Sequence, residues 1–308
     1  IDRLLARLGA SEAAPGKAMP WEARFVALIG PSGSGKSSVV QAGLIPQVLR
    51  ITAATGHPWR LAPMRPGADP VAALAAALQA SLPVDAATEA ADAAFEQALR
   101  SDTAGLARIL AAHLDPGQVW LLVLDQAEEF FTLVPDQATT NHFSELLLAA
   151  LQAPAGHMRQ ITLMRADYYA LPLEYPAWGK LFQERLEVTL PLTPEELRQA
   201  IVGPAGRLGV VVEPDLVAQM IADAGQMWGA LPLLQYTLTE LFERRAGNRM
   251  TYSAYQDLGG IAGALARRAE ELYDQLDAQA QQMARQVFLR LVAPQETGVA
   301  VRQKMARD

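Results

Sequence analysis

Short apolar runs alternate with helical patterns along the chain up to about residue 190. Five runs have the length and apolar character of buried strands: 24–30, 59–66, 119–125, 160–165 and 186–192. Between them, helices are predicted over 36–44 and 139–153. The Ala- and Leu-rich stretch 69–112 predicts two more helices, broken near Pro83. Because strands and helices alternate, we expect an α/β fold with a parallel five-stranded sheet.

Outside this alternating region the patterns are helical. Residues 1–10 predict the end of a helix, and residues 11–20, which contain Pro, Gly and Ser, predict a linker. After residue 190, helical patterns cover 192–201, 213–225, 231–245, 261–276 and 278–292. The first of them begins with Thr193 as a cap and Pro194 at the first helical position. We therefore expect an N-terminal helix and linker over 1–20, an α/β core over 21–190, and a helical C-terminal part.

A glycine-rich segment follows the first predicted strand. Its sequence, GPSGSGKS, fits the pattern G-x-x-x-x-G-K-[ST] in full and lies between a strand and a helix, as this motif requires. Together with the serine after it, the segment comprises Gly30, Pro31, Ser32, Gly33, Ser34, Gly35, Lys36, Ser37 and Ser38. Glycines let the backbone wrap around phosphate, and a helix N-terminus favours an anion.

Two side chains of this segment have specific roles in such a motif. Lys36 is placed to reach the β- and γ-phosphates, and the Ser37 hydroxyl to ligate Mg²⁺. We therefore expect a phosphate loop that binds ATP or ADP with Mg²⁺. The preference for ATP over GTP is a prior, supported by the absence of the guanine-binding pattern N-K-x-D from the sequence.

Acidic residues follow the apolar strand over 119–125. We expect this strand to neighbour the phosphate-loop strand, which would place Asp125 to hold Mg²⁺ directly or through water. Glu128 or Glu129 can orient or deprotonate the attacking water. The sequence leaves open which glutamate does so. In many such ATPases the base directly follows the metal-binding aspartate, and here that position holds Gln126.

The gap between Lys36 and Asp125 leaves room for an extra strand, for which 59–66 is the candidate. This favours the additional-strand, catalytic-glutamate type of P-loop protein.

The ends of two predicted strands supply candidate cations. If the strand over 160–165 lies beside the first, Arg165 at its end faces the γ-phosphate and can distinguish ATP from ADP. The alternative is a surface ion pair with Asp167. Arg65, at the end of 59–66, is a weaker candidate than Arg165 for this role.

Composition narrows the classes of protein. The chain has 308 residues, of which 51% are hydrophobic and 19% charged, so global disorder is excluded. It contains no cysteine, which excludes disulfides, Cys-ligated zinc and a Cys nucleophile.

The net charge of −7 argues against a general nucleic-acid surface, and we expect no nucleic-acid partner. Apolar runs are too short to span a bilayer and no signal peptide is visible, so we expect a cytoplasmic location without a membrane partner. The 22 Arg against 4 Lys suggest a GC-rich bacterial gene.

Several segments taken together resemble the STAND class of signalling ATPases, and specifically the bacterial novel STAND NTPases. They run in family order and cover most of the chain. The matching segments are RFVALIGPSGSGKSSVVQAGLIP (24–46), RPGADP (65–70), LLVLDQAEEFF (121–131), ITLMRADYY (161–169), LPLTPEELRQAIVGPAGRLG (190–209), LPLLQYTLTELFERR (231–245) and TYSAYQDLGGIAGALARRAEELYDQL (251–276). The glycine-arginine box usual upstream of the first strand is missing.

The resemblance implies a nucleotide-gated switch, closed with ADP, which opens and oligomerises with ATP, hydrolyses ATP slowly and controls fused effector and repeat-sensor domains. It implies that Lys36 and Ser37 hold phosphate and Mg²⁺, that Asp125 forms the acidic motif with the two glutamates, and that Arg165 is a sensor. It also implies that Pro232 packs against the nucleotide from a helical domain (191–250). Residues 251–308 resemble the start of a winged-helix domain.

Two other functions remain open at the level of the sequence. The first is a continuously hydrolysing ATPase of the AAA or origin-recognition kind, whose ring would need an arginine in trans, for which Arg159 and Arg185 are candidates. The second is a non-catalytic module that holds ADP as a structural ligand. The intact acidic motif argues against this second function.

Overall fold

The computed structural model describes residues 1–10, 19–54, 56, 59–82, 89–225, 227, 229–294 and 300–302. The chain divides into two units, Ile1–Pro191 and Leu192–Asp308. Over the described residues, none of the helices combines the length and the apolar character that crossing a membrane requires.

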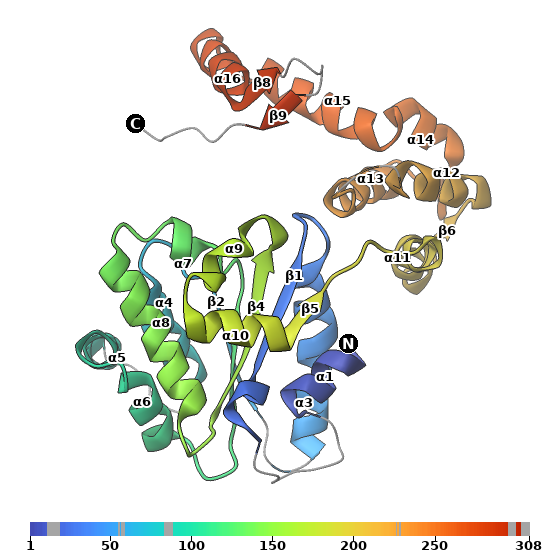
Figure 1. Cartoon of the computed structure of the whole chain (residues 1–308). Coiled ribbons are helices and arrows are strands. Elements are labelled where there is room, and N and C mark those ends of the chain that lie inside the picture. The colour runs from blue at the N-terminus through green and yellow to red at the C-terminus, as the bar shows by residue number, and fades with distance from the viewer. Residues whose placement is uncertain are drawn as a thin grey trace. The chain divides into compact units, whose positions relative to one another are not determined.

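One parallel sheet forms the centre of the first unit (Figure 1). Its strands are β1 (Phe25–Gly30), β2 (Arg60–Met64), β3 (Trp120–Leu124), β4 (Met158–Arg165) and β5 (Leu186–Val188). Their order across the sheet is β2-β3-β4-β1-β5, and each neighbouring pair is parallel. The predicted α/β fold with a five-stranded parallel sheet is therefore confirmed.

The order of the strands corrects one prediction and confirms another. β4 lies between β1 and β3, so the strand that precedes Asp125 does not neighbour the phosphate-loop strand, and that prediction was wrong. The strand predicted over 59–66 is present as β2, at the edge of the sheet beside β3. Crossover connections can skip a neighbour, and the sequence does not reveal when they do. β4 does lie beside β1, with Gly30 opposite Arg165.

The helices of the first unit differ from prediction in two places. Their bounds are α1 (Asp2–Leu8), η1 (Trp21–Arg24), α2 (Lys36–Ser38), η2 (Val39–Leu44), α3 (Ile45–Ala54), α4 (Pro70–Ser81), α5 (Glu89–Ser101), α6 (Gly105–His113), α7 (Glu129–Thr132), α8 (Gln137–Gln152), η3 (Ala166–Tyr168), α9 (Ala170–Leu173) and α10 (Pro176–Arg185). The helix predicted over 36–44 continues through the π-helical η2 into α3. The described part of 69–112 forms three helices rather than two, because the Asp102 carboxylate accepts a hydrogen bond from the Ala104 N–H (2.9 Å) between α5 and α6.

Helices cover both faces of the sheet, and alternate residues of β1 point to opposite sides. Phe25, Ala27 and Ile29 belong to an apolar cluster with α4, α5, α6, α8 and α10. Val26 and Leu28 belong to a second cluster with α1 and α3. β1 is consequently buried at every position, which explains why its sequence is a continuous apolar run.

The second unit is mainly helical and has its own apolar cluster. Its elements are α11 (Pro194–Arg207), β6 (Val211–Val212), α12 (Pro214–Gly225), α13 (Leu231–Glu243), β7 (Arg249–Met250), α14 (Tyr252–Leu258), α15 (Gly260–Asp274), α16 (Ala278–Leu291), β8 (Val292–Pro294) and β9 (Ala300–Arg302). Thr193 caps α11 as predicted and forms a capping box with Glu196. The sequence missed α14 and the short strand pairs, since strands of two or three residues show no measurable alternation.

Candidate functional site

The loop after β1 is shaped by glycines. Gly33 and Gly35 have φ angles of 72° and 83°, which L side chains adopt only with strain. Gly35 also stands at the N-cap of α2, where no side chain caps the helix. The first N–H groups of the continuous helical stretch that begins at Lys36 are therefore left without a side-chain acceptor, which suits an anion.

Lys36 crosses the inside of this loop. Its ammonium group donates hydrogen bonds to the carbonyl oxygens of Gly30 and Pro31, each at 2.8 Å. The side chain is buried, and burial lowers the pKa of Lys36 from its ordinary value, while the nearby Glu128 carboxylate acts in the opposite direction. The loop thus holds a cation at its centre, as the motif predicts. Ser32 at the tip of the loop and Ser38 in α2 are both exposed.

Thr189, just after β5, contacts the loop from the side, and no sequence pattern identified it. Its hydroxyl lies 2.9 Å from Ser34 Oγ and donates to the Ile29 carbonyl at 3.2 Å. A Cβ on Gly30 would lie 1.8 Å from Thr189 Oγ1, so only glycine fits there. Thr189 and Glu187 are the two polar residues of the mostly apolar segment 186–192, and this was the available signal.

Asp125 contacts Ser37, although the strands that precede them, β3 and β1, are not neighbours in the sheet. The Ser37 hydroxyl donates to Asp125 Oδ1 at 2.9 Å, and the Gln126 N–H donates to the same oxygen at 3.0 Å. The second carboxylate oxygen, Oδ2, is buried and has no hydrogen-bond partner in the described part of the chain. The guanidinium of Arg65 lies 3.8 Å from Oδ2, and the Arg65 side chain is 61% exposed.

This pair of side chains fits a magnesium ion. A buried carboxylate oxygen without a hydrogen-bond donor, next to a hydroxyl, is a suitable ligand set because Mg²⁺ takes one or two protein oxygens and completes its shell with water and phosphate. Among the described residues, no group of three or more His, Cys, Asp or Glu side chains could form a metal cage without phosphate. Ser37 and Asp125 would thus hold the ion jointly with a nucleotide.

The two glutamates after β3 have different partners. Glu128 is buried, and its Oε2 accepts a hydrogen bond from the Arg165 N–H at 3.3 Å. Glu129 is half-buried and accepts from the Gly67 N–H at 3.1 Å, in the loop between β2 and α4. Gln126, with a φ of 55°, makes the left-handed turn that separates these acids from Asp125. Of the two glutamates, Glu128 is the one whose negative charge raises the pKa of Lys36.

Arg165 ends β4 directly beside the phosphate loop, opposite Gly30 in the parallel register. Its guanidinium is paired with the Asp167 carboxylate and lies 5.4 Å from the centre of the Tyr168 ring. The hydrogen bond to Asp167 raises the pKa of Arg165. Both possibilities left open by the sequence, a place beside the loop and a pair with Asp167, are therefore present in one geometry.

The other arginines considered from the sequence are held within their own chain. Arg159 donates to the Gly156 and Met158 carbonyls, and burial lowers its pKa to about 10. Arg185 donates to the Phe25 carbonyl at 3.1 Å. These contacts argue against either side chain reaching a neighbouring subunit, because a guanidinium acting in trans must be exposed.

A family model described as Novel STAND NTPase 1 matches residues 1–308. The chain belongs to this family. This STAND NTPase is thus a nucleotide-binding P-loop protein, and the resemblance found in its sequence motifs is confirmed.

Solved structures resemble this STAND NTPase in fold. The ORC1 protein of Aeropyrum pernix, solved in complex with DNA, matches with a TM-score of 0.60 and 17% identity, over 94% of this chain and 70% of that chain. The ORC2 protein of Aeropyrum pernix in its ADP form gives a TM-score of 0.53 and 14% identity, over 87% of this chain and 65% of that chain. At such identities the likeness shows a P-loop NTPase fold and nothing finer. No curated protein sequence matches this chain.

Pro232, which the resemblance placed near the nucleotide, lies in the second unit of this STAND NTPase. It is the second residue of α13 and is exposed there. Proline is favoured in the first turn of a helix because it needs no N–H acceptor there, so its position alone also has a local explanation.

Proposed function

We propose that this STAND NTPase is a signalling switch operated by adenine nucleotides. It is closed with ADP, opens and oligomerises with ATP, and returns by slow Mg²⁺-dependent hydrolysis. It acts in the cytoplasm on fused or associated effector domains. The observation that carries the proposal is the meeting of Lys36, the Ser37–Asp125 pair and Arg165 at the carboxyl end of β1.

In this proposal the phosphate loop, Gly30 to Ser38, binds the nucleotide. Lys36 exchanges the carbonyls of Gly30 and Pro31 for phosphate oxygens, which is favourable because the ammonium group binds a negatively charged oxygen more strongly than a neutral carbonyl oxygen. Ser37 and Asp125 hold Mg²⁺, which neutralises charge on the phosphate oxygens when bound.

We assign the role of general base to Glu128 ahead of Glu129. Glu128 is buried and lies near both Lys36 and the Arg165 backbone, whereas Glu129 is held by the loop between β2 and α4. A base must be within hydrogen-bond reach of the attacking water, and that water stands in line with the γ-phosphate that Lys36 binds. These contacts support Glu128.

Arg165 is proposed as the sensor of the γ-phosphate. It stands beside the loop, paired with Asp167. ATP presents a γ-phosphate with higher charge density than the Asp167 carboxylate, so the guanidinium has a stronger partner with ATP than with ADP. This difference in affinity is what allows the nucleotide to shift a two-state equilibrium.

The second unit is proposed to respond to this change. We assign 191–250 to a helical domain, with Pro232 as its nucleotide-contacting residue, and 251–308 to the start of a winged-helix domain. The antiparallel pair of β8 and β9 after helices α14 to α16 supports the latter.

The nucleotide content of the purified protein tests the proposal. The protein is purified without added nucleotide and denatured, and the released compound is identified by chromatography. Near-stoichiometric ADP is the expected result. A Lys36→Ala variant should release none and bind ADP at least about 100-fold more weakly in calorimetry, because contacts to charged groups contribute about 1.5–3 kcal/mol each. Lys180→Ala, which removes an exposed cation 3.9 Å from Glu22, is the matched control.

Other outcomes point to other functions. An empty site with steady turnover of ATP and Mg²⁺ would favour a continuously hydrolysing ATPase of the AAA or origin-recognition kind. Bound ADP that never exchanges, with no turnover, would favour a structural nucleotide. Unchanged binding by Lys36→Ala would remove the phosphate-loop assignment itself.

A further inference from the structure

The carboxyl end of β5 is in direct contact with the phosphate loop. Since the Thr189 hydroxyl donates its one hydrogen to the Ile29 carbonyl, Ser34 is the donor in the 2.9 Å contact between the two hydroxyls. The Thr189 N–H also donates to Ile29, at 2.8 Å. Thr189 therefore connects the last part of β1 to a residue of the loop.

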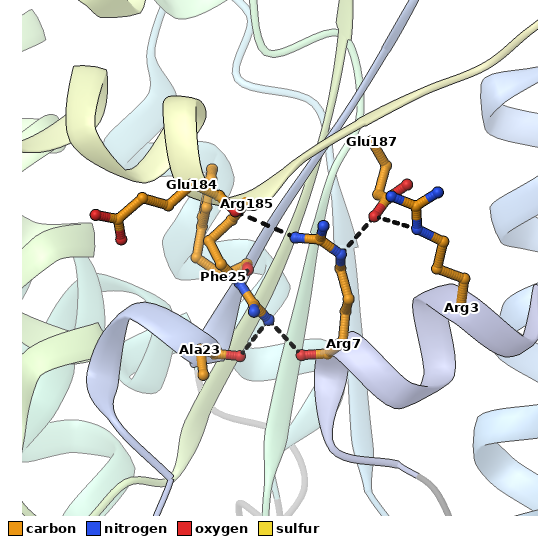
Figure 2. A network of polar contacts seen from close by, with 7 residues as sticks. All are labelled: Arg3, Arg7, Ala23, Phe25, Glu184, Arg185 and Glu187. Atoms are coloured by element: carbon orange, nitrogen blue, oxygen red, sulfur yellow. Dashed lines mark hydrogen bonds and ion pairs between the residues drawn. The ribbon is translucent and has the colours of Figure 1, made fainter.

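Helix α1 contacts the middle of the same strand. Glu187, in β5, is buried and forms ion pairs with Arg7 and with Arg3 (2.8 Å), as Figure 2 shows. The Arg7 side chain is 24% exposed and that of Arg3 is 73% exposed. Arg7 is consequently the partner whose loss matters more, because exposed ion pairs contribute little.

Arg185 joins α1 to the starts of β1 and β5. Its Nη2 donates to the Arg7 carbonyl at 2.6 Å and to the Ala23 carbonyl at 3.1 Å, and its Nε donates to the Phe25 carbonyl at 3.1 Å (Figure 2). Arg7 in turn donates to the Glu184 carbonyl at 3.3 Å. This clasp, made of Arg3, Arg7, Arg185 and Glu187, fixes α1 to β5 and to the strand that leads into the phosphate loop.

Glu187 and Thr189 are two positions apart along an extended segment. Side chains at such positions share one face of a strand, about 6.6 Å apart along its axis. α1 therefore contacts β5 close to Thr189, the residue that is hydrogen-bonded to Ser34. We propose that β5 couples α1 to the phosphate loop. Glu187 forms the ion pairs with α1, and Thr189 positions Ser34. A displacement of α1 would therefore weaken the binding of the nucleotide.

This inference rests on the nucleotide binding proposed above, and concerns how the affinity of that site is set. α1 is suited to the role because it also packs on the loop strand: Leu4, Leu5 and Leu8 lie in one apolar cluster with Val26 and Leu28 of β1. A force on α1 therefore reaches β1, which leads into the loop, and β5, which is followed by Thr189. Thr189 and Glu187 act through other residues and are positioning residues.

The test of the Thr189 step is the rate of ADP release from the whole chain, measured with fluorescent ADP and Mg²⁺ after mixing with excess ADP. Thr189→Val removes the hydroxyl at nearly constant shape and should speed release roughly fivefold, the effect of one neutral hydrogen bond. Thr189→Ser, which keeps the hydroxyl, should stay within about twofold of the parent. Thr140→Val is the matched control, since it removes a buried hydroxyl that donates to the Asp136 carbonyl in α8.

The test of the α1 step uses Glu187→Gln and, in case that variant folds poorly, Arg7→Gln, which keeps the carbonyl that Arg185 needs. Each should speed ADP release several-fold, whereas Glu96→Gln, which breaks an exposed pair with Arg100, should not. Combining Glu187→Gln with Thr189→Val should give no more than the larger single effect, because both act along one connection.

The outcomes separate the two proposals. If Lys36→Ala binds ADP like the parent, the nucleotide site itself is wrongly assigned. If Lys36→Ala loses binding but Thr189→Val releases ADP at the parent rate, the coupling through Thr189 is refuted. If Glu187→Gln and Arg7→Gln lower the melting temperature while ADP release is unchanged, or if the double variant shows the product of the single effects, α1 only stabilises the fold.

Discussion

At the scale of single residues, the two glutamates after β3 offer a direct comparison, because they are adjacent but face different groups. Glu128→Gln should lower the single-turnover rate of ATP hydrolysis by about 100-fold or more while ATP stays bound, since a general base contributes that much and the amide cannot accept the proton. Glu129→Gln should change the rate less than about threefold, because its carboxylate is engaged by the Gly67 N–H. Rapid-quench measurement with enzyme in excess checks both.

The same pair of variants contains its own control, since they differ by one position and in nothing else. A fast Glu128→Gln with a slow Glu129→Gln would reverse the assignment, and equal losses would mean that the two acids act together. Tight binding of ATP by both variants is required before either rate is interpreted.

Asp125 is the residue whose prediction concerns the metal. Its Oδ2 is buried and without a hydrogen-bond partner in the described part of the chain, so an ion there adds a ligand without displacing a donor. Mg²⁺ should raise ATP affinity in the parent, and Asp125→Asn should lose about tenfold or more of that gain, with affinity in EDTA nearly unchanged. Calorimetric titration with Mg²⁺ and with EDTA measures the difference.

Asp136→Asn is the control for this substitution, because Asp136 caps α8 and asparagine caps a helix equally well. It should respond to Mg²⁺ like the parent. An Asp125→Asn variant that keeps the full effect of Mg²⁺ would mean that the metal is held elsewhere.

At the scale of elements, the approach of β5 to the start of the phosphate loop depends on one missing side chain. A Cβ on Gly30 would lie 1.8 Å from Thr189 Oγ1 and 2.8 Å from Ser34 Oγ. Gly30→Ala should therefore lower the free energy of unfolding by about 1–3 kcal/mol, the usual cost of overpacking. Adding Thr189→Ala should recover part of the loss. Urea denaturation followed by tryptophan fluorescence measures both.

Gly203→Ala is the control for the glycine substitution. A Cβ at this position of α11 would meet nothing within 4 Å, so alanine should leave stability unchanged or raise it slightly. If Gly30→Ala is as stable as the parent, the contact between β5 and the loop is looser than described.

The elements also show how far the sequence alone could be interpreted. Buried parallel strands are continuous apolar runs, and the phosphate loop has fixed spacing, so both were predicted with small errors at their ends. The position of β4 between β1 and β3 was not, because strand order depends on crossovers that leave no local pattern. Thr189 was missed for a related reason: its importance comes from Ser34, a partner 155 positions away.

At the scale of the whole molecule, a switch needs two units whose relation depends on the nucleotide. The first unit contains the phosphate loop, the acidic residues and Arg165, and it ends at Pro191, two residues after Thr189. The second unit begins with α11, whose capping box stabilises a defined start at Thr193. Thr189, proposed to position the loop, thus lies close along the chain to the boundary between the units, where the proposed switch would transmit a nucleotide-dependent change.

Pro232 provides the test at this scale, since two explanations for it differ in outcome. If it only starts α13, Pro232→Ala should change stability slightly and leave ADP release unaltered. If it contacts the nucleotide as proposed, release should become about three- to tenfold faster, the loss of one packed apolar contact of about 1 kcal/mol. Stopped-flow displacement of fluorescent ADP measures the rate, and thermal unfolding measures the stability.

Pro194→Ala separates the two explanations, because Pro194 occupies the first turn of α11 and is exposed, as Pro232 is in α13. Both substitutions remove a proline from a helix start, so their effects on stability should be alike. Faster ADP release by Pro232→Ala alone would establish that the second unit contributes to the nucleotide site. Equal release by both variants and the parent would leave Pro232 a helix-starting residue and move the coupling to β5 and Thr189.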